Sequence, residues 1–254
     1  MYKLLNFISI LLLLTLTQSA NKLRQTKLVT NTLKALNLGN SASFAILTKT
    51  GVTDVSPSSV VGNVGAYPIT GAAILLTCPE IVGTVYQVDA AGAACFVTNA
   101  SHLLSSIGDM EIAYTAANLL ANPDFIEYGA GDISGATLTP GLYKWSSSVL
   151  INADFYLCGT PNDVFIFTIA GNINQAANTK LTLLGGVKTS NIFWVVQGAS
   201  VDIQAGAVLQ GTILAKGGIN LITGAKVYGR LLAQTAVTLQ MNTIVIPSNK
   251  KYTT

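Results

Sequence analysis

Hydrophobic residues alternate with small or polar residues along the C-terminal part of the chain. The alternation runs through Ser200-Val-Asp-Ile203, Gly218-Ile-Asn-Leu221 and Ala236-Val-Thr-Leu239. A period of two is typical of a strand with one buried face. The three stretches follow one another at a fixed step of 18 residues, so one template is reused. Such a repeat predicts a solenoid, in which the outward residues of successive coils stack into a flat array.

The period changes in the middle of the chain. Between Asn99 and Asn122, apolar residues recur at spacings of three and four, which predicts an amphipathic helix. Its apolar positions are Leu103, Leu104, Ile107, Ala113, Ala117 and Leu120. The helix should end at Asn122-Pro123, because the residue before a proline is disfavoured in the helical conformation.

Strand-like patterns flank this helix on both sides. On the N-terminal side, residues 38–97 hold short β-like runs broken by Gly and Pro, at Phe44-Ala-Ile-Leu47, Val60-Val61 and Ile81-Val82. These runs predict a first coil followed by irregular capping structure. On the C-terminal side the strand pattern resumes at Ile133 and continues to Pro247.

The first 20 residues have the layout of a secretory signal peptide. Lys3 precedes an apolar run from Leu4 to Leu16, and small and polar residues follow up to Ala20. The alternative is a retained membrane anchor, but the run is shorter than the roughly 20 residues that a bilayer span needs. We therefore predict a signal peptide over 1–20, a spacer or poorly ordered lead-in over 21–37, one β-solenoid domain over 38–247 and a tail over 248–254. The mature protein is expected to be extracellular and not membrane-bound.

The composition argues against several classes of function. Charged residues make up 10% of the 254 residues, against about 25% in typical globular chains. The 14 Lys and Arg exceed the 11 Asp and Glu by little, so no basic face for nucleic acid is expected. Six carboxylates scatter through the cap, the helix and the connection after it: Asp89, Asp109, Glu111, Asp124, Glu127 and Asp132. A catalytic or metal cluster is therefore not predicted, and neither is a cofactor.

Two rival functions follow from the solenoid prediction. A pectate-lyase-like enzyme would need Asp, Arg and Lys clustered on a repeat face, and the repeats lack them. An adhesin or polysaccharide-binding module would use aromatic platforms, but Trp145 and Trp194 lie in strand-like apolar contexts and are expected in the core. The single histidine, His102, is expected to be a solvated or capping residue near the helix start.

Secretion permits disulfide bonds, and we pair Cys78 with Cys95 across a Gly- and Ala-rich stretch. Closing this loop would stabilise the fold by about 3 kcal/mol in the chain-entropy model. Cys158 remains over and is expected to be a small buried apolar residue. Asn99-Ala-Ser101 fits the glycosylation acceptor pattern, although Ser101 could simply cap the helix.

Seven short segments, which together span nearly all of residues 38–247, have a distinctive sequence: Leu38-Gly-Asn-Ser-Ala-Ser-Phe-Ala-Ile-Leu47, Val61-Gly-Asn-Val-Gly65, Asn122-Pro-Asp124, Gly129-Ala-Gly-Asp-Ile133, Leu138-Thr-Pro-Gly-Leu-Tyr-Lys-Trp145, Asn191-Ile-Phe-Trp-Val195 and Gly211-Thr-Ile-Leu-Ala215. In these segments and their order, the chain resembles the secreted ice-binding proteins of microbes. The resemblance implies a discontinuous β-solenoid of triangular cross-section with one long α-helix packed alongside. It also implies that the N-terminal coil stacks beside the C-terminal one.

The family's ice-facing motif is Thr-Ala/Gly-X-Thr/Asn. Thr50-Gly-Val-Thr53 and Thr235-Ala-Val-Thr238 match it, and coil stacking would make them neighbours. Three other segments keep the motif less well: Gly217-Gly-Ile-Asn220, Gly171-Asn-Ile-Asn174 and Ala199-Ser-Val-Asp202. In Ser147-Ser-Val-Leu150, Leu150 is expected to face elsewhere, and Asp202 would place a hydrated charge in the array.

The resemblance thus implies a non-enzymatic, monomeric antifreeze protein whose partner is the ice surface. The residues expected to face ice are Thr50, Gly51, Thr53, Asn172, Asn174, Ser200, Asp202, Gly218, Asn220, Thr235, Ala236 and Thr238.

Overall fold

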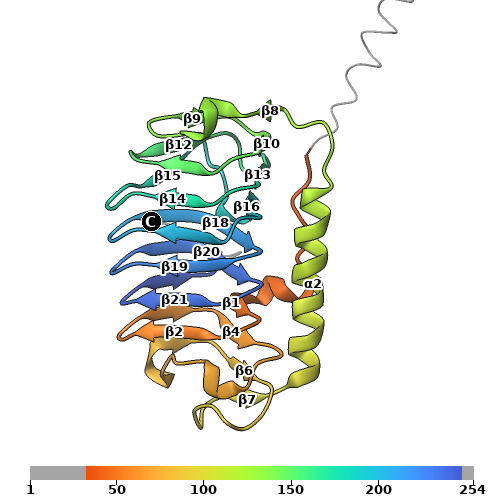
Figure 1. Ribbon diagram of the computed structural model, residues 1–254, viewed down its shortest axis with the longest axis vertical. Helices are drawn as coiled ribbons and strands as arrows, with labels where there is room; N and C mark the ends of the chain where they lie inside the picture. Colours follow the sequence, from red (N-terminus) through yellow and green to blue (C-terminus); the bar gives the residue numbers. More distant parts are fainter. Residues whose placement is uncertain (1–32, 248–254) are drawn as a thin grey trace, which may run out of the picture. The chain divides into compact units, whose positions relative to one another are not determined.

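Every strand pair in the part of the chain that the structure describes, residues 33–247, is parallel. In this computed structural model, the strands stack into a β-solenoid with three faces, and one helix lies alongside (Figure 1). The predicted fold class is therefore confirmed. The predicted signal peptide, most of the spacer and the tail lie outside the described residues. The account below concerns the unit that begins at Ala35.

The helix-covered face is the longest of the three sheets. Its strands, in spatial order, are β7 (Val97–Thr98), β6 (Val85–Gln87), β4 (Asn63–Ala66), β1 (Phe44–Thr48), β20 (Lys226–Ala233), β18 (Val208–Ala215), β16 (Ile192–Val196), β13 (Phe165–Ile169), β10 (Gly141–Trp145) and β8 (Phe125–Ile126).

The six-stranded face is a separate sheet. It runs in the order β11 (Val149–Ile151), β14 (Ile173–Gln175), β17 (Ser200–Ile203), β19 (Gly218–Leu221), β21 (Val237–Gln240) and β2 (Val52–Val55). The third face holds β9 (Thr137–Leu138), β12 (Phe155–Cys158), β15 (Leu181–Leu184), the first halves of β18 and β20, and then β22 (Thr243–Val245), β3 (Ser59–Val61) and β5 (Ile81–Val82). Short 3-10 helices occupy Gly39–Ser43 (η1), Gly71–Ala73 (η2), Cys78–Glu80 (η3), Tyr128–Gly131 (η4) and Thr189–Asn191 (η5).

The first coil of the chain stacks on the last one. Strand β1 pairs with β20, β2 with β21, and β3 with β22. The solenoid is therefore discontinuous in sequence, as the resemblance implied, and Thr53 is the register partner of Thr238.

The 18-residue repeat holds only for the coils that carry no insertion. Asp202 pairs with Asn220, and Asn220 with Thr238. The preceding coil is longer, because Asn174 pairs with Asp202 and the chain between them includes β15 and η5. Loops between strands thus hide the repeat from the sequence in the N-terminal half of the solenoid.

The interior is filled by the inward side chains of all three faces. Trp145 and Trp194 are almost completely buried, which confirms their predicted core position. Their rings flank Phe167, whose centroid lies 4.1 Å from that of Trp194 and 6.2 Å from that of Trp145. Stacked aromatic side chains of this size contribute strongly to core stability, and they leave no tryptophan platform at the surface.

Helix α2 (Ala100–Asn118) confirms the predicted helix and packs along the helix-covered face (Figure 1). Its buried stripe is Leu103, Ser106, Ile107, Met110, Ala113 and Ala117. Leu104, predicted to belong to this stripe, is instead 55% exposed, because it lies about 100° around the helix from Leu103. The predicted end at Asn122-Pro123 is wrong, because the helix ends at Asn118, and Leu120 lies beyond it and is half-buried.

The start of α2 corrects two further expectations. Asn99 is the N-cap, since its Oδ1 accepts the backbone N–H of His102 at 3.1 Å. Ser101 does not cap the helix, because its hydroxyl donates to the same Asn99 oxygen at 3.1 Å. His102 is half-buried instead of fully solvated, and its ring packs against Phe44 and Tyr86 at centroid distances of 5.5 and 4.8 Å.

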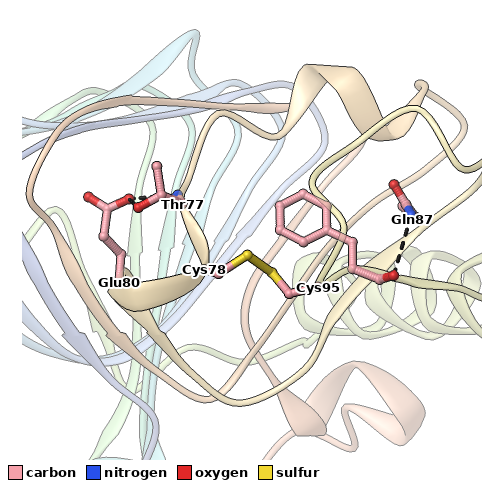
Figure 2. Close-up of a disulfide and its surroundings, with 6 residues drawn as sticks. Thr77, Cys78, Glu80, Gln87 and Cys95 are labelled. Carbon is pink, nitrogen blue, oxygen red and sulfur yellow. Dashed lines mark hydrogen bonds between the residues drawn. A yellow bond between two sulfur atoms is a disulfide. The ribbon is translucent and has the colours of Figure 1, made fainter.

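The cap that follows the first coil is held by the predicted disulfide (Figure 2). Cys78 and Cys95 are bonded, with their Cα atoms 6.2 Å apart. Next to this bond, the almost fully buried Gln87 accepts the N–H of Gly92 at 2.9 Å and donates to the Phe96 carbonyl at 3.5 Å. The Gln87 side chain thereby fixes the irregular backbone between β6 and β7.

The expectation for the third cysteine is wrong. Cys158 is exposed at the end of β12. In this strand Phe155 and Leu157 are buried, so the alternation places Cys158 on the outer side.

Candidate functional site

A central rank of outward side chains crosses the six-stranded face, with one contributed by each strand. In spatial order these are Thr53, Thr238, Asn220, Asp202, Asn174 and Leu150, each in register with the next. Neighbouring members are separated by the ordinary strand spacing of about 4.8 Å. The residues on either side of them in each strand are buried, except for the half-buried Asp54 in β2. A flat array with a fixed repeat follows from this alternation.

A rank of smaller residues lies beside the central rank. It contains Gly51, Ala236, Gly218, Ser200 and Asn172, two positions earlier in each coil. Thr50 and Thr235 stand at the adjoining corner, where the Thr50 N–H donates to the Thr235 carbonyl at 3.4 Å. The structure therefore brings all the residues predicted to face ice onto one face and its corner.

Two members of the smaller rank are not free surface groups. Gly51 is buried. The Asn172 side chain supports the backbone of the next coil, because its Oδ1 accepts the Ser200 N–H at 3.2 Å. Both residues stabilise coil stacking, and their polar groups are less available than the exposed hydroxyl of Thr53.

The carboxylate of Asp202 is bound within the face. Its Oδ1 accepts the Asn220 amide at 2.7 Å, and its Oδ2 accepts the Ser200 hydroxyl at 2.6 Å. Asp202 itself is half-buried. The sequence predicted a hydrated charge at this position, whereas in the structure each carboxylate oxygen accepts a hydrogen bond from a protein side chain.

Close backbone contact explains why one coil lacks the expected threonine. A β-carbon built on Gly217 would overlap the carbonyl group of Ala199 in the preceding coil. Gly218 is different, because a β-carbon there would meet its nearest neighbour, the Ala236 carbonyl oxygen, at 3.5 Å. The first motif position of this coil is therefore restricted to glycine, and the second is not.

The structure adds three apolar side chains that the motif did not identify. Leu150 lies in the central rank and is 40% exposed, so it does not face elsewhere. At the other end, Leu75 follows Ile74, which bridges to Val52, and is 54% exposed. Val55, two positions after Thr53, is 56% exposed. In Val149-Leu150-Ile151 every residue is apolar, so the sequence alone could not tell which side faced out.

Only two charged side chains occur on the six strands of this face, Asp202 and Asp54. Asp54 occupies an inward position at the end of β2, where the Ser58 hydroxyl donates to its Oδ1 at 2.6 Å. Burial raises the pKa of Asp54, and the nearby Glu80 adds to this effect. The outer surface of the face is thus almost free of formal charge.

Glu80 connects the cap to the end of β2. Its Oε1 accepts the Ser56 hydroxyl at 2.7 Å and the Ser58 N–H at 2.8 Å. Its Oε2 accepts the N–H and hydroxyl of Thr77 at 2.6 and 2.7 Å (Figure 2). Burial alone would raise the pKa of Glu80, but these hydrogen bonds outweigh it and lower the pKa to about 2.

Most of the scattered carboxylates bind nearby backbone and are separate from this face. Asp89, Asp124, Glu127 and Asp132 each accept a backbone N–H, from Gly71, Leu142, Ser146 and Ser134 respectively. Asp109 binds Asn40, and Glu111 forms a 2.7 Å ion pair with Lys49. Within residues 33–247, no three His, Cys, Asp or Glu side chains come together as a metal site would require. No helix in that range has the length and hydropathy of a membrane span.

Comparisons with known proteins give a consistent result. The profile of the ice-binding-like family matches residues 46–245. An ice-binding protein of Flavobacterium frigoris is 54% identical over 216 residues, which cover 85% of this chain and 78% of the relative. An ice-binding protein of a Colwellia species is 49% identical over 217 residues, 85% of each chain. The crystal structure of a glycosylated ice-binding protein from an Arctic yeast superposes with a TM-score of 0.79 at 33% identity, covering 87% of this chain and 97% of that one.

Proposed function

The chain belongs to the ice-binding-like family, and on that premise we propose that it adsorbs to ice through the six-stranded face and inhibits crystal growth. The observation that carries this proposal is the in-register rank led by Thr53 and Thr238 on a flat, nearly uncharged sheet. Adsorption of this kind requires no chemical turnover, and we propose that the protein is not an enzyme.

The types of side chain on this face suit an ordered water layer. A threonine methyl group cages water while its hydroxyl anchors it, and an asparagine amide both donates and accepts hydrogen bonds. Each methyl removed from water contributes only about 0.8 kcal/mol. Binding therefore depends on many contacts that engage together on a rigid scaffold, with little ordering cost.

Bound protein molecules would pin the ice front, which then has to bulge between them. The curvature of the front lowers the local freezing point below the melting point. The resulting gap, thermal hysteresis, is the direct measure of the proposed activity.

We further propose that the protein is secreted after removal of residues 1–20, that residues 38–247 form the whole functional domain and that it works as a monomer without nucleic acid or membrane. Asn99 is a proposed glycosylation site. Its Oδ1 is used in capping α2, which leaves the amide nitrogen as the point of attachment. Mass spectrometry of protein from the native source tests both the cleavage site and the glycan.

Nanolitre osmometry on the secreted protein tests the main proposal. We expect faceted crystals and a measurable hysteresis gap. Round, unshaped crystals that grow as soon as the sample is cooled below the melting point would refute it. Retained binding to insoluble polysaccharide under those conditions would instead favour the adhesin alternative.

A further inference from the structure

The asparagine in the middle of the central rank has a defined orientation. A carboxylate can only accept hydrogen bonds, so the short bond between Asn220 and Asp202 must come from the amide NH₂ group. The two ends of an amide are otherwise hard to distinguish by position. Here the neighbouring charge determines which end lies where, and a charge-assisted bond of 2.7 Å is among the stronger kinds.

The amide carbonyl consequently faces the space above Gly218. A β-carbon built on Gly218 would lie 4.0 Å from the Asn220 Oδ1 and 3.6 Å from the Thr235 Oγ1. An acceptor and a hydroxyl therefore lie close together on the outward side of Gly218, where no side chain covers them. A water molecule bound above Gly218 would find two polar partners at fixed positions.

Asp202 itself is held in place from the opposite side. The Ser200 hydroxyl donates to its second oxygen at 2.6 Å. Ser200 and Asp202 lie two residues apart on β17, and Asn220 is on the adjacent β19. The carboxylate is thus fixed by its own strand and in turn orients a side chain of the next one.

We propose that Asp202 is a positioning residue for ice binding, which turns the Asn220 amide so that its carbonyl oxygen lies above Gly218 beside the Thr235 hydroxyl. This role rests on the proposed function of the six-stranded face. By fixing the orientation of Asn220, Asp202 extends the part of the face with defined side-chain positions beyond the two coils that carry Thr53 and Thr238.

A double-mutant cycle on thermal hysteresis tests the proposal. Asp202→Ala should lower hysteresis at equal protein concentration by about twofold, since a preoriented group becomes free to rotate. Asn220→Ala should produce a similar loss. The double variant should be no worse than Asn220→Ala alone, because Asp202 acts through that residue. Melting temperatures should shift by no more than about 4 °C.

Asn174 offers a matched control, since it is the other register neighbour of Asp202. The effect of Asp202→Ala should persist in an Asn174→Ala background. Asp202→Asn should recover most of the hysteresis that Asp202→Ala loses, because its amide oxygen can still accept the Asn220 NH₂ group. It also keeps the test available if the alanine variant fails to fold.

Three results would overturn the positioning role. The first is a rise in hysteresis in Asp202→Ala, which would mean that the Asp202 charge disturbs ice binding. The second is additive losses in the double-mutant cycle with Asn220. The third is an Asp202→Asn variant that loses as much hysteresis as Asp202→Ala. A wild-type protein without hysteresis would instead refute the proposed function itself, so the two failures are distinguishable.

Discussion

Thr238 is the position where a single substitution should separate ice binding from folding. It is half-buried in the central rank, between Thr53 and Asn220, and its neighbours Val237 and Leu239 are completely buried. A side chain at this position therefore projects outward. Replacement by tyrosine keeps the strand preference and adds a ring that stands above the array.

The size of the effect follows from how steeply contacts weaken with distance. A gap of about 1 Å already forfeits up to half of the dispersion energy of a contact. A tyrosine ring is several times taller than this gap, so the ranks on both sides lose contact with the ice together. Folding should be little affected, because the Thr238 side chain projects from the outer surface of the sheet, and surface substitutions without special contacts change stability by about 0.5 kcal/mol or less.

We expect Thr238→Tyr to remove most of the thermal hysteresis while the melting curve stays within about 2 °C of the wild type. Thr53→Tyr should behave in the same way, because β2 adjoins β21. Lys226→Tyr is the matched control, since Lys226 is exposed on the third face. Hysteresis that survives at Thr238 but disappears at Lys226 would show that the third face contacts ice.

Three further predictions concern what holds the face together. Cys78→Ser combined with Cys95→Ser should cost about 3 kcal/mol of stability without lowering hysteresis below the melting transition, and an unchanged melting temperature would contradict this. Because the pKa of Glu80 is lowered to about 2 in the folded protein, its carboxylate stabilises the fold above about pH 4.5, and this stabilisation is lost as the pH falls toward 2. The loss is on the order of 3 kcal/mol. Glu80→Gln should therefore weaken the decrease in melting temperature at acid pH. Gly217→Ala should cost about 1–3 kcal/mol through overpacking, whereas Gly218→Ala should not, and equal losses would refute the steric explanation.

The sequence predicted most of the outward residues because strand periodicity is a local property. In Gly218-Ile-Asn-Leu221 each inward residue marks its outward neighbours, and this local rule placed Asn220 correctly. The same rule would have placed Cys158 outside, since Phe155 and Leu157 alternate with it. For Cys158, the small apolar character of cysteine was given more weight than the alternation, and the prediction was wrong.

Contacts between coils could not be predicted in the same way. Gly217 is required by the carbonyl of Ala199, and the hydrated charge expected at Asp202 is bound by Asn220 in the next coil. Both relations join residues 18 positions apart in the sequence, and neither leaves a local pattern. The stacking of the first coil on the last came from the family resemblance and has no signal in the periodicity of either coil.

The best-matched threonine ranks lie at the end of the face where a polar network joins the ends of β2 and β21. Immediately after β2, the hydroxyl of the buried Ser58 donates to Asp54 at 2.6 Å and accepts the N–H of Asn242 at 2.9 Å. Asn242 follows β21, so this hydroxyl joins the ends of the two strands that carry Thr53 and Thr238.

Glu80 extends the same connection into the disulfide-bonded cap, because its Oε1 holds the Ser58 N–H. Rigid matching to a lattice requires that neighbouring ranks keep their spacing when water around them orders. Here the discontinuous chain order places the cap directly against the threonine strands, and a short polar network provides the restraint.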